Sequence, residues 1–127
     1  AGVIVLVLML VRLVWRWLNP PPPLPASVPV WQARAAHLTH VLLYALIFVM
    51  AISGYVRVVA GGFPLELPDA LGLPRLLPKV ESLGNAASTV HYLTHYAVIA
   101  LIALHVGAAL FHGIVRRDGV FGRMWRG

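Results

Sequence analysis

Long apolar stretches alternate along the chain with short polar stretches that are rich in proline. The first apolar stretch, residues 1–18, is interrupted by Arg12 and Arg16. Residues 35–56 form a second stretch without Asp, Glu, Lys or Arg, and residues 82–115 form a third. A helix that crosses a bilayer needs about 20 mainly apolar residues, so the second and third stretches are each long enough to span a membrane.

This pattern predicts three helices, over residues 1–18, 35–59 and 86–116. Residues 19–25, Asn-Pro-Pro-Pro-Pro-Leu-Pro, predict a stiff polyproline connector between the first two helices. Four prolines exclude a long helix from the loop that we expect at residues 61–81.

The first helix is expected to be the cytoplasmic end of a longer one whose start lies before Ala1. Only residues 1–11 precede the first charge, which is too few for a span. The positive charges follow the apolar run, whereas a signal peptide carries them before it. The chain also does not begin with Met.

Composition supports a membrane location. The chain is 60% hydrophobic and 11% charged, whereas soluble domains are about 25% charged. A soluble core built from 127 residues is too small to bury that much apolar surface. We therefore predict an all-α membrane protein, a transmembrane helical bundle. The absence of cysteine excludes disulfides and thiolate-bound metal or iron–sulfur centres from this chain.

The net charge of +6 reflects basic residues that flank the apolar runs, and no basic and aromatic platform for nucleic acid interrupts those runs. The loop at residues 61–81 balances Arg75 and Lys79 with three acids. By the positive-inside rule, that loop is periplasmic, whereas the first connector and the C-terminus are cytoplasmic. The residues that mark the cytoplasmic side are Arg16, Arg34, Arg116, Arg117, Arg123 and Arg126.

Six histidines lie in or beside the apolar stretches, where ionisable residues are rare and usually functional. His91 and His105 are 14 residues apart, which returns them to within about 40° of one helix face and separates them by about 21 Å along the axis. This spacing fits two haems stacked in one bundle, one in each leaflet, with imidazole ligands from facing helices. The others are His37, His40, His95 and His112.

Other readings of the histidines stay open. Zinc is disfavoured because His91 and His95, although spaced i, i+4, have no carboxylate or thiol beside them in the span. His37 and His95 are also explained by hydrogen bonds between helices or by interfacial positions. His112 is expected near the headgroups, in contact with a haem propionate, a quinone or solvent. A cofactor-free membrane anchor or assembly subunit, and a proton or metal transporter with a histidine relay, are the competing classes.

Several segments resemble bacterial cytochrome b561. Residues 10–16, Leu-Val-Arg-Leu-Val-Trp-Arg, followed by the proline connector, are similar to the end of its second helix. Residues 37–44, His-Leu-Thr-His-Val-Leu-Leu-Tyr, are similar to the start of its third helix. Residues 91–119 resemble its fourth helix and tail, through Leu-His-Val-Gly-Ala-Ala-Leu-Phe-His and Arg-Arg-Asp-Gly. The resemblance covers nearly the whole chain, and the cytochrome b subunits of nickel-iron hydrogenases and formate dehydrogenases share the broad plan.

The resemblance implies one membrane domain over residues 1–127, with three of the family's four helices and the first of these partial. It implies two b haems, with His91 as the periplasmic-side iron ligand and His105 as the cytoplasmic-side one. The partner histidines are then expected in helices upstream of Ala1, with His40 as an alternative partner for His105. His37 and Arg12 are further candidate cofactor contacts, and Arg34 and Arg57 are candidates for charge pairing.

The function that the resemblance implies is electron transfer in the bacterial inner membrane, linked to ubiquinone. Two bis-histidine haems have no open coordination site, so they relay electrons instead of activating oxygen. In the family the donor is superoxide for some members and a dehydrogenase or hydrogenase subunit for others. Arg75 and Lys79 would attract superoxide, but three acids in the same loop oppose that attraction.

Overall fold

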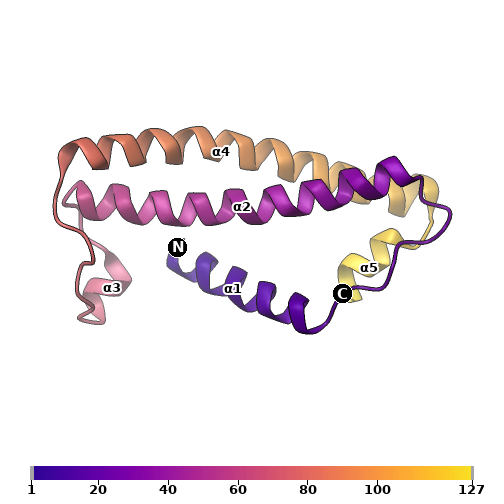
Figure 1. Cartoon of the computed structure of the whole chain (residues 1–127), viewed down its shortest axis with the longest axis horizontal. Coiled ribbons are helices and arrows are strands. Elements are labelled where there is room, and N and C mark those ends of the chain that lie inside the picture. Colours follow the sequence, from indigo (N-terminus) through magenta and orange to yellow (C-terminus); the bar gives the residue numbers. More distant parts are fainter. Residues whose placement is uncertain (1, 127) are drawn as a thin grey trace.

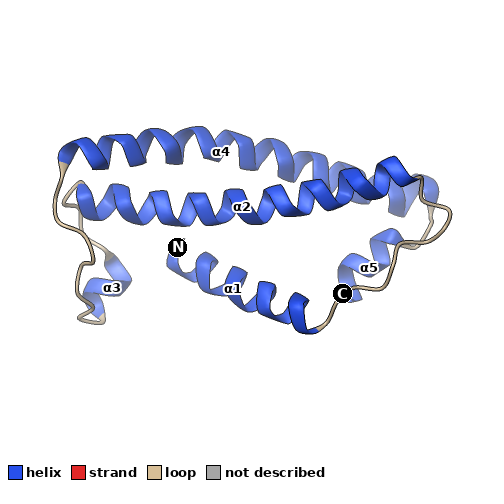
Figure 2. Cartoon of the chain, viewed as in Figure 1, coloured by secondary structure: helices blue, strands red, loops and turns tan. Residues whose placement is uncertain are grey.

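The computed structural model describes residues 2–126, with side chains described through Arg123. Every regular element in this described part is helical, as Figure 2 shows. Two long helices, α2 (Val30–Ala60) and α4 (Glu81–Leu110), lie side by side and antiparallel, and α1 (Gly2–Leu18) packs along α2 (Figure 1). The predicted all-α class is confirmed.

Both long helices begin earlier than the sequence pattern indicated. α2 starts at Val30, directly after Pro29, and not at residue 35. α4 starts at Glu81 and not at residue 86. The prediction followed the apolar stretches, but a helix continues through the polar residues at a membrane boundary. The acidic Glu81 also suits the positive end of the helix dipole in the first turn.

The end of α4 differs from the single helix expected through residue 116. After Leu110 the chain becomes a π-helix, η1 (Phe111–Arg116). Arg117 and Gly119 then adopt left-handed conformations, with φ of 48° and 79°, and reverse the chain. A last helix, α5 (Val120–Arg126), packs back against η1 and was not predicted. The side chain of Arg126, used in the topology argument, lies outside the described side chains.

The connection between α2 and α4 is an ordered loop with one short helix, α3 (Glu66–Ala70), which its prolines allow. The Val80 N–H donates to the carbonyl of Ala60 (3.0 Å), and the Leu76 N–H donates to the hydroxyl of Tyr55 (3.2 Å). These two hydrogen bonds attach the loop to the end of α2.

The pairing of α2 with α4 follows a regular seven-residue register. Gly84 of α4 approaches the backbone of Gly61, since a Cβ on Gly84 would lie 3.1 Å from the Gly61 nitrogen. Seven residues further along α4, His91 lies against Gly54. Fourteen residues beyond that, His105 lies against His40. Equal steps along both helices are typical of helices that keep one face together over a long distance.

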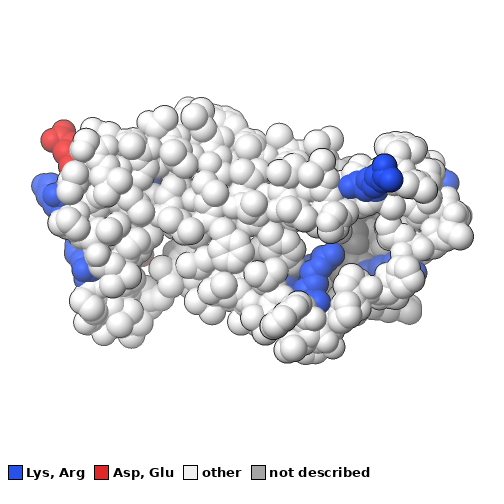
Figure 3. Space-filling model, in the orientation of Figure 1, with Lys and Arg blue, Asp and Glu red and all other residues white. Residues whose placement is uncertain are grey.

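Most apolar side chains of this bundle face outward. Val59, Ala60 and Ala87 are the hydrophobic residues buried among those described. α2 is 31 residues long and residues 81–116 number 36, and an 18-residue stretch within each has a mean hydropathy of 2.1 and 2.2, so both are long and apolar enough to cross a membrane. In the face shown in Figure 3, charged side chains lie toward the two ends, and the middle is uncharged. Lipid or other membrane helices are the natural surroundings of such a surface.

Candidate functional site

His91 lies on the face of α4 that contacts α2, and its ring is held at one edge. The Nδ1 atom of His91 lies 3.0 Å from the carbonyl oxygen of Met50 and 3.2 Å from the hydroxyl oxygen of Ser53. A Cβ on Gly54 would lie 3.1 Å from the Cε1 atom of His91, so a larger residue would force the ring back by a few tenths of an ångström. The ring therefore rests on one turn of α2.

The second imidazole on this face belongs to His105. Its ring centroid lies 5.3 Å from that of His40 on α2, and the two ring planes are inclined by 65°. Both side chains are half-buried. As their 14-residue spacing predicts, His91 and His105 share one face of α4, about 21 Å apart along the helix.

The neighbourhood of His40 is basic. Arg12 and Arg16 of α1, together with His37 one turn earlier on α2, lie within electrostatic range of His40. Arg12 was predicted as a cofactor contact, and the structure brings it toward the same end of the bundle as His40. Arg16 had been given only a topological role, and its position beside this cluster was missed.

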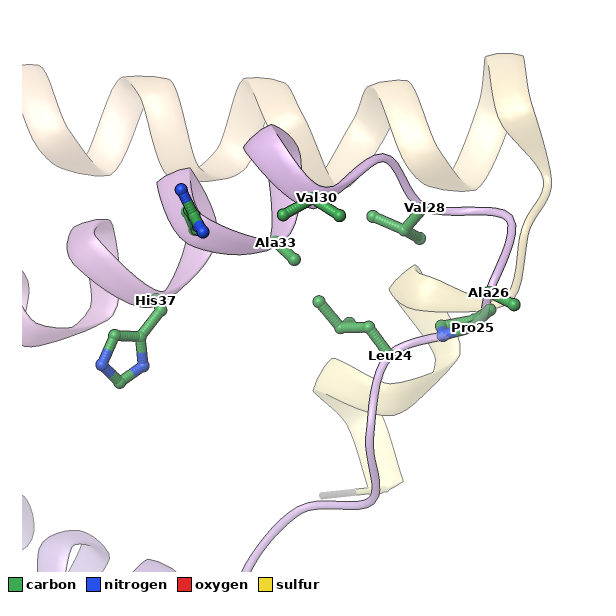
Figure 4. A pocket seen from close by; sticks show the side chains of 8 residues that line it. Leu24, Pro25, Ala26, Val28, Val30, Ala33 and His37 are labelled. Atoms are coloured by element: carbon green, nitrogen blue, oxygen red, sulfur yellow. The ribbon is translucent and has the colours of Figure 1, made fainter.

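His37 and His95 lie away from the interface between α2 and α4. His37 is exposed and lines a shallow groove of about 550 Å³ together with Arg34, Leu24 and Val28, next to the proline connector (Figure 4). His95 is exposed on the outside of α4, where its ring packs edge-on against Tyr96 with centroids 5.6 Å apart. Neither histidine joins His91 or His105 in a single cluster.

A second polar arrangement lies at the end of α4. The Nδ1 atom of His112 lies 2.6 Å from a carboxylate oxygen of Asp118, and the Val120 N–H donates to the other oxygen at 3.2 Å. Burial by itself would raise the pKa of Asp118, but the hydrogen bonds from His112 and Val120 outweigh burial and lower that pKa below its ordinary value. Sequence reasoning missed Asp118, although an Asp-Gly pair after a long apolar helix indicates a turn there.

The residues of α2 that hold His91 were also missed. Met50, Ser53 and Gly54 are spaced i, i+3 and i+4, so they share one face of the helix. A Ser-Gly pair inside an apolar span was the available signal, because small residues allow close helix approach in membranes.

Comparison with known proteins identifies the family. The family model for prokaryotic cytochrome b561 matches residues 1–127. The chain belongs to this family. Cytochrome b561 homolog 2 of Escherichia coli K12 is 32% identical over 126 residues, which cover 97% of this chain and 65% of that protein. Cytochrome b561 homolog 1 of the same organism is 30% identical over 124 residues, which cover 98% and 70%.

The chain thus spans about two thirds of the length of these cytochrome b561 relatives. No solved structure matches it significantly. The family is one of membrane cytochromes, which agrees with the two candidate spans, and it implies binding of b-type haem.

The donor set on α4 suits the haem that the cytochrome b561 family implies. A haem iron needs only axial ligands from the protein, and imidazole is a common one. His91 and His105 each offer an imidazole that does not belong to a larger cluster, since no three His, Asp or Glu residues gather in the described part. The hydroxyl of Tyr44, one turn after His40, is buried without a partner among the described residues, which leaves a donor for a bound group.

Proposed function

We propose that this chain is part of a membrane cytochrome that transfers electrons through two b haems, with His91 and His105 as axial ligands. Residues 1–127 would form one membrane domain, in which α1, α2 and α4 correspond to the second, third and fourth helices of the family. The second axial ligand of each haem is expected from helices upstream of Ala1.

One observation carries this proposal: two imidazoles lie on the same face of one spanning helix at different depths. The separation of His91 and His105, about 21 Å along the helix axis, fits within a hydrocarbon layer of about 30 Å, with one haem toward each leaflet. Both rings face α2 and the interior of the bundle. If both imidazole rings had faced the lipid, the alternative of a membrane anchor without a cofactor would have been favoured.

The haem would supply one-electron chemistry, and the chain's own residues would bind and orient it. His91 of α4 would bind the periplasmic-side haem while its ring stays in contact with Met50 and Ser53 of α2. His105 would approach the cytoplasmic-side haem, where His40 and Arg12 provide polar contacts. Arg12 and Arg16 suit the carboxylates of haem propionates, because a guanidinium pairs well with a carboxylate where water is scarce.

We further propose ubiquinone as one redox partner, and superoxide or a dehydrogenase or hydrogenase subunit as the other. The location would be the bacterial inner membrane, with several spans, a periplasmic loop at residues 61–81 and a cytoplasmic C-terminus. The support for this orientation is the distribution of basic residues along the chain.

The test is the haem content of the full-length protein and its histidine variants. We expect a sharp α-band in the reduced-minus-oxidised spectrum, loss of one haem in His91→Ala and loss of the other in His105→Ala. His95→Ala is the matched control, since His95 lies on the outside of the same helix. A colourless full-length protein, or unchanged spectra in both ligand variants, would overturn the proposal.

A further inference from the structure

We propose that Ser53 is a positioning residue for the His91 ligand and helps to set the reduction potential of the haem that His91 binds. This inference rests on the proposed function, because it concerns the same site. It depends on three neighbouring groups of α2: the Met50 carbonyl, the Ser53 hydroxyl and the bare Cα of Gly54.

The protonation of His91 follows from the Met50 contact. A carbonyl oxygen only accepts hydrogen bonds, so an Nδ1 atom 3.0 Å from it must carry the proton. In a neutral imidazole, protonation of Nδ1 leaves the lone pair on Nε2. The hydrogen bond to α2 therefore selects the tautomer that binds iron through Nε2.

Ser53 completes this arrangement from a buried position. Its residue is only 7% exposed, and its hydroxyl oxygen lies 3.2 Å from the Nδ1 atom of His91. Because Nδ1 carries the proton, the Ser53 oxygen acts as a second acceptor for that N–H. The Ser53 hydroxyl proton is then free to be donated to the Met50 carbonyl at 3.3 Å. All three polar groups are satisfied by one another, inside a span where water is scarce.

The absence of a side chain at Gly54 lets the His91 ring lie close to the backbone of α2. The Cε1 and Nδ1 atoms of His91 would lie 3.1 and 3.3 Å from a Cβ at that position. Since Cε1 joins the two ring nitrogens, the edge held by α2 is the Nδ1–Cε1 edge. Nε2 is consequently the nitrogen directed away from the Met50 and Ser53 oxygens.

The Ser53 contact has an electronic consequence as well as a geometric one. Hydrogen-bond acceptors at the outer nitrogen of a ligating histidine fix its orientation and make it a stronger electron donor to the metal. A stronger donor stabilises ferric iron and lowers the reduction potential. Loss of the Ser53 hydroxyl should therefore raise that potential, and loss of such an outer contact typically weakens metal binding by about 10-fold or more.

The experiment is a redox titration of the full-length protein carrying Ser53→Ala. We expect one of the two midpoint potentials to become more positive, the haem affinity of that site to fall about 10-fold, and the other haem to be unchanged. The altered haem should be the one that His91→Ala removes. Ser53→Thr, which keeps the hydroxyl, should restore the wild-type potential.

The matched control is Ser88→Ala. Ser88 lies on α4, and its hydroxyl donates to the carbonyl of Gly84 within the same helix. This variant should leave both potentials unchanged. If Ser53→Ala also leaves both potentials and both affinities unchanged while wild-type protein binds two haems, the role of Ser53 is overturned and the proposed function stands. If the wild-type protein binds no haem, both fail together.

Discussion

The imidazole rings of His40 and His105 meet edge to face across the interface of α2 and α4, with centroids 5.3 Å apart. Each is half-buried within a candidate membrane span. The contact makes His40 the nearest imidazole neighbour of a proposed haem ligand. Under the proposed function, His40 is then a polar neighbour of the haem that His105 would bind.

We predict that His40→Ala in the full-length protein keeps both haems, whereas His105→Ala loses one. The reason is that the family resemblance assigns the partner of His105 to an upstream helix, and His40 then borders the site. The removal of a polar neighbour should shift the spectrum or potential of the cytoplasmic-side haem without emptying it. Haem content from the pyridine haemochrome, together with a redox titration, measures both effects.

His37→Ala is the control for this comparison, because His37 is an exposed residue one turn earlier on the same helix. We expect the haem content of His37→Ala to equal that of the wild-type protein within experimental error. Complete loss of one haem in His40→Ala, equal to the loss in His105→Ala, would instead make His40 an axial ligand.

The pairing of the two helices could be anticipated from sequence in part. The shared face of His91 and His105 follows from helical periodicity alone, and the structure has both rings on that face. What they contact does not follow, because periodicity along α4 contains no information about α2. The contacts of His91 with Gly54 and Ser53 depend on the seven-residue register between the two helices, which the sequence of α4 alone does not give.

The ends of the elements were the least predictable part. Hydropathy marks where a charge-free apolar run begins, and both helices begin before that point: α2 at Val30, ahead of Arg34, and α4 at Glu81. The π-helix after Leu110 and the fold-back to α5 occur together with a contact between His112 and Asp118, six residues apart. The Asp-Gly pair at residues 118–119 indicates a turn, but it does not predict the π-helix or the packing of α5 against η1.

The close approach of α2 and α4 at the loop end predicts that Gly84→Ala destabilises the bundle. The new Cβ would lie 3.1 Å from the Gly61 nitrogen and 3.3 Å from the Ala60 carbonyl carbon, and backbone atoms cannot rotate away as a flexible side chain can. We expect a cost of about 1–3 kcal/mol from overpacking, partly offset by up to about 1 kcal/mol of gained helix propensity. Unfolding in mixed detergent measures the difference.

Gly122→Ala serves as the matched substitution, since nothing lies within 4 Å of a Cβ at that helical position. It should be neutral or slightly stabilising. A Gly84→Ala variant as stable as Gly122→Ala would show that the helices separate there at no cost.

The contact between His112 and Asp118 predicts a pH-dependent C-terminal fold-back. Burial opposes ionisation of Asp118, but hydrogen bonds from His112 and Val120 prevail and hold its pKa below the ordinary 3.8. A lowered folded pKa means that the contact stabilises the fold-back above the unfolded pKa of about 3.9. That contribution is lost as the pH falls through the still lower folded value.

Hydrogen exchange of residues 111–123, corrected for the intrinsic effect of pH, measures this dependence. Wild-type protein should show protection at pH 7 that declines below about pH 4. Asp118→Asn should show weak protection at both values. Asp69→Asn, which removes an exposed carboxylate paired with Arg75 at the other end of the bundle, should behave as wild type. Equal protection in wild-type and Asp118→Asn protein at pH 7 would contradict the assignment.

The distribution of basic residues predicts on which side of the membrane each end of the bundle lies. Residues 1–127 contain no cysteine, so a single introduced thiol reports its own position once any upstream cysteine is replaced by serine. Leu76→Cys, at a site 78% exposed in the loop, should react with a membrane-impermeant maleimide in intact cells. Gly122→Cys should react only after the inner membrane is permeabilised.

Ile99→Cys, in the middle of α4, is the control that should resist the reagent under both conditions. Labelling of Gly122→Cys in intact cells, with protection of Leu76→Cys, would reverse the orientation and exchange the sides of the two haems proposed at His91 and His105.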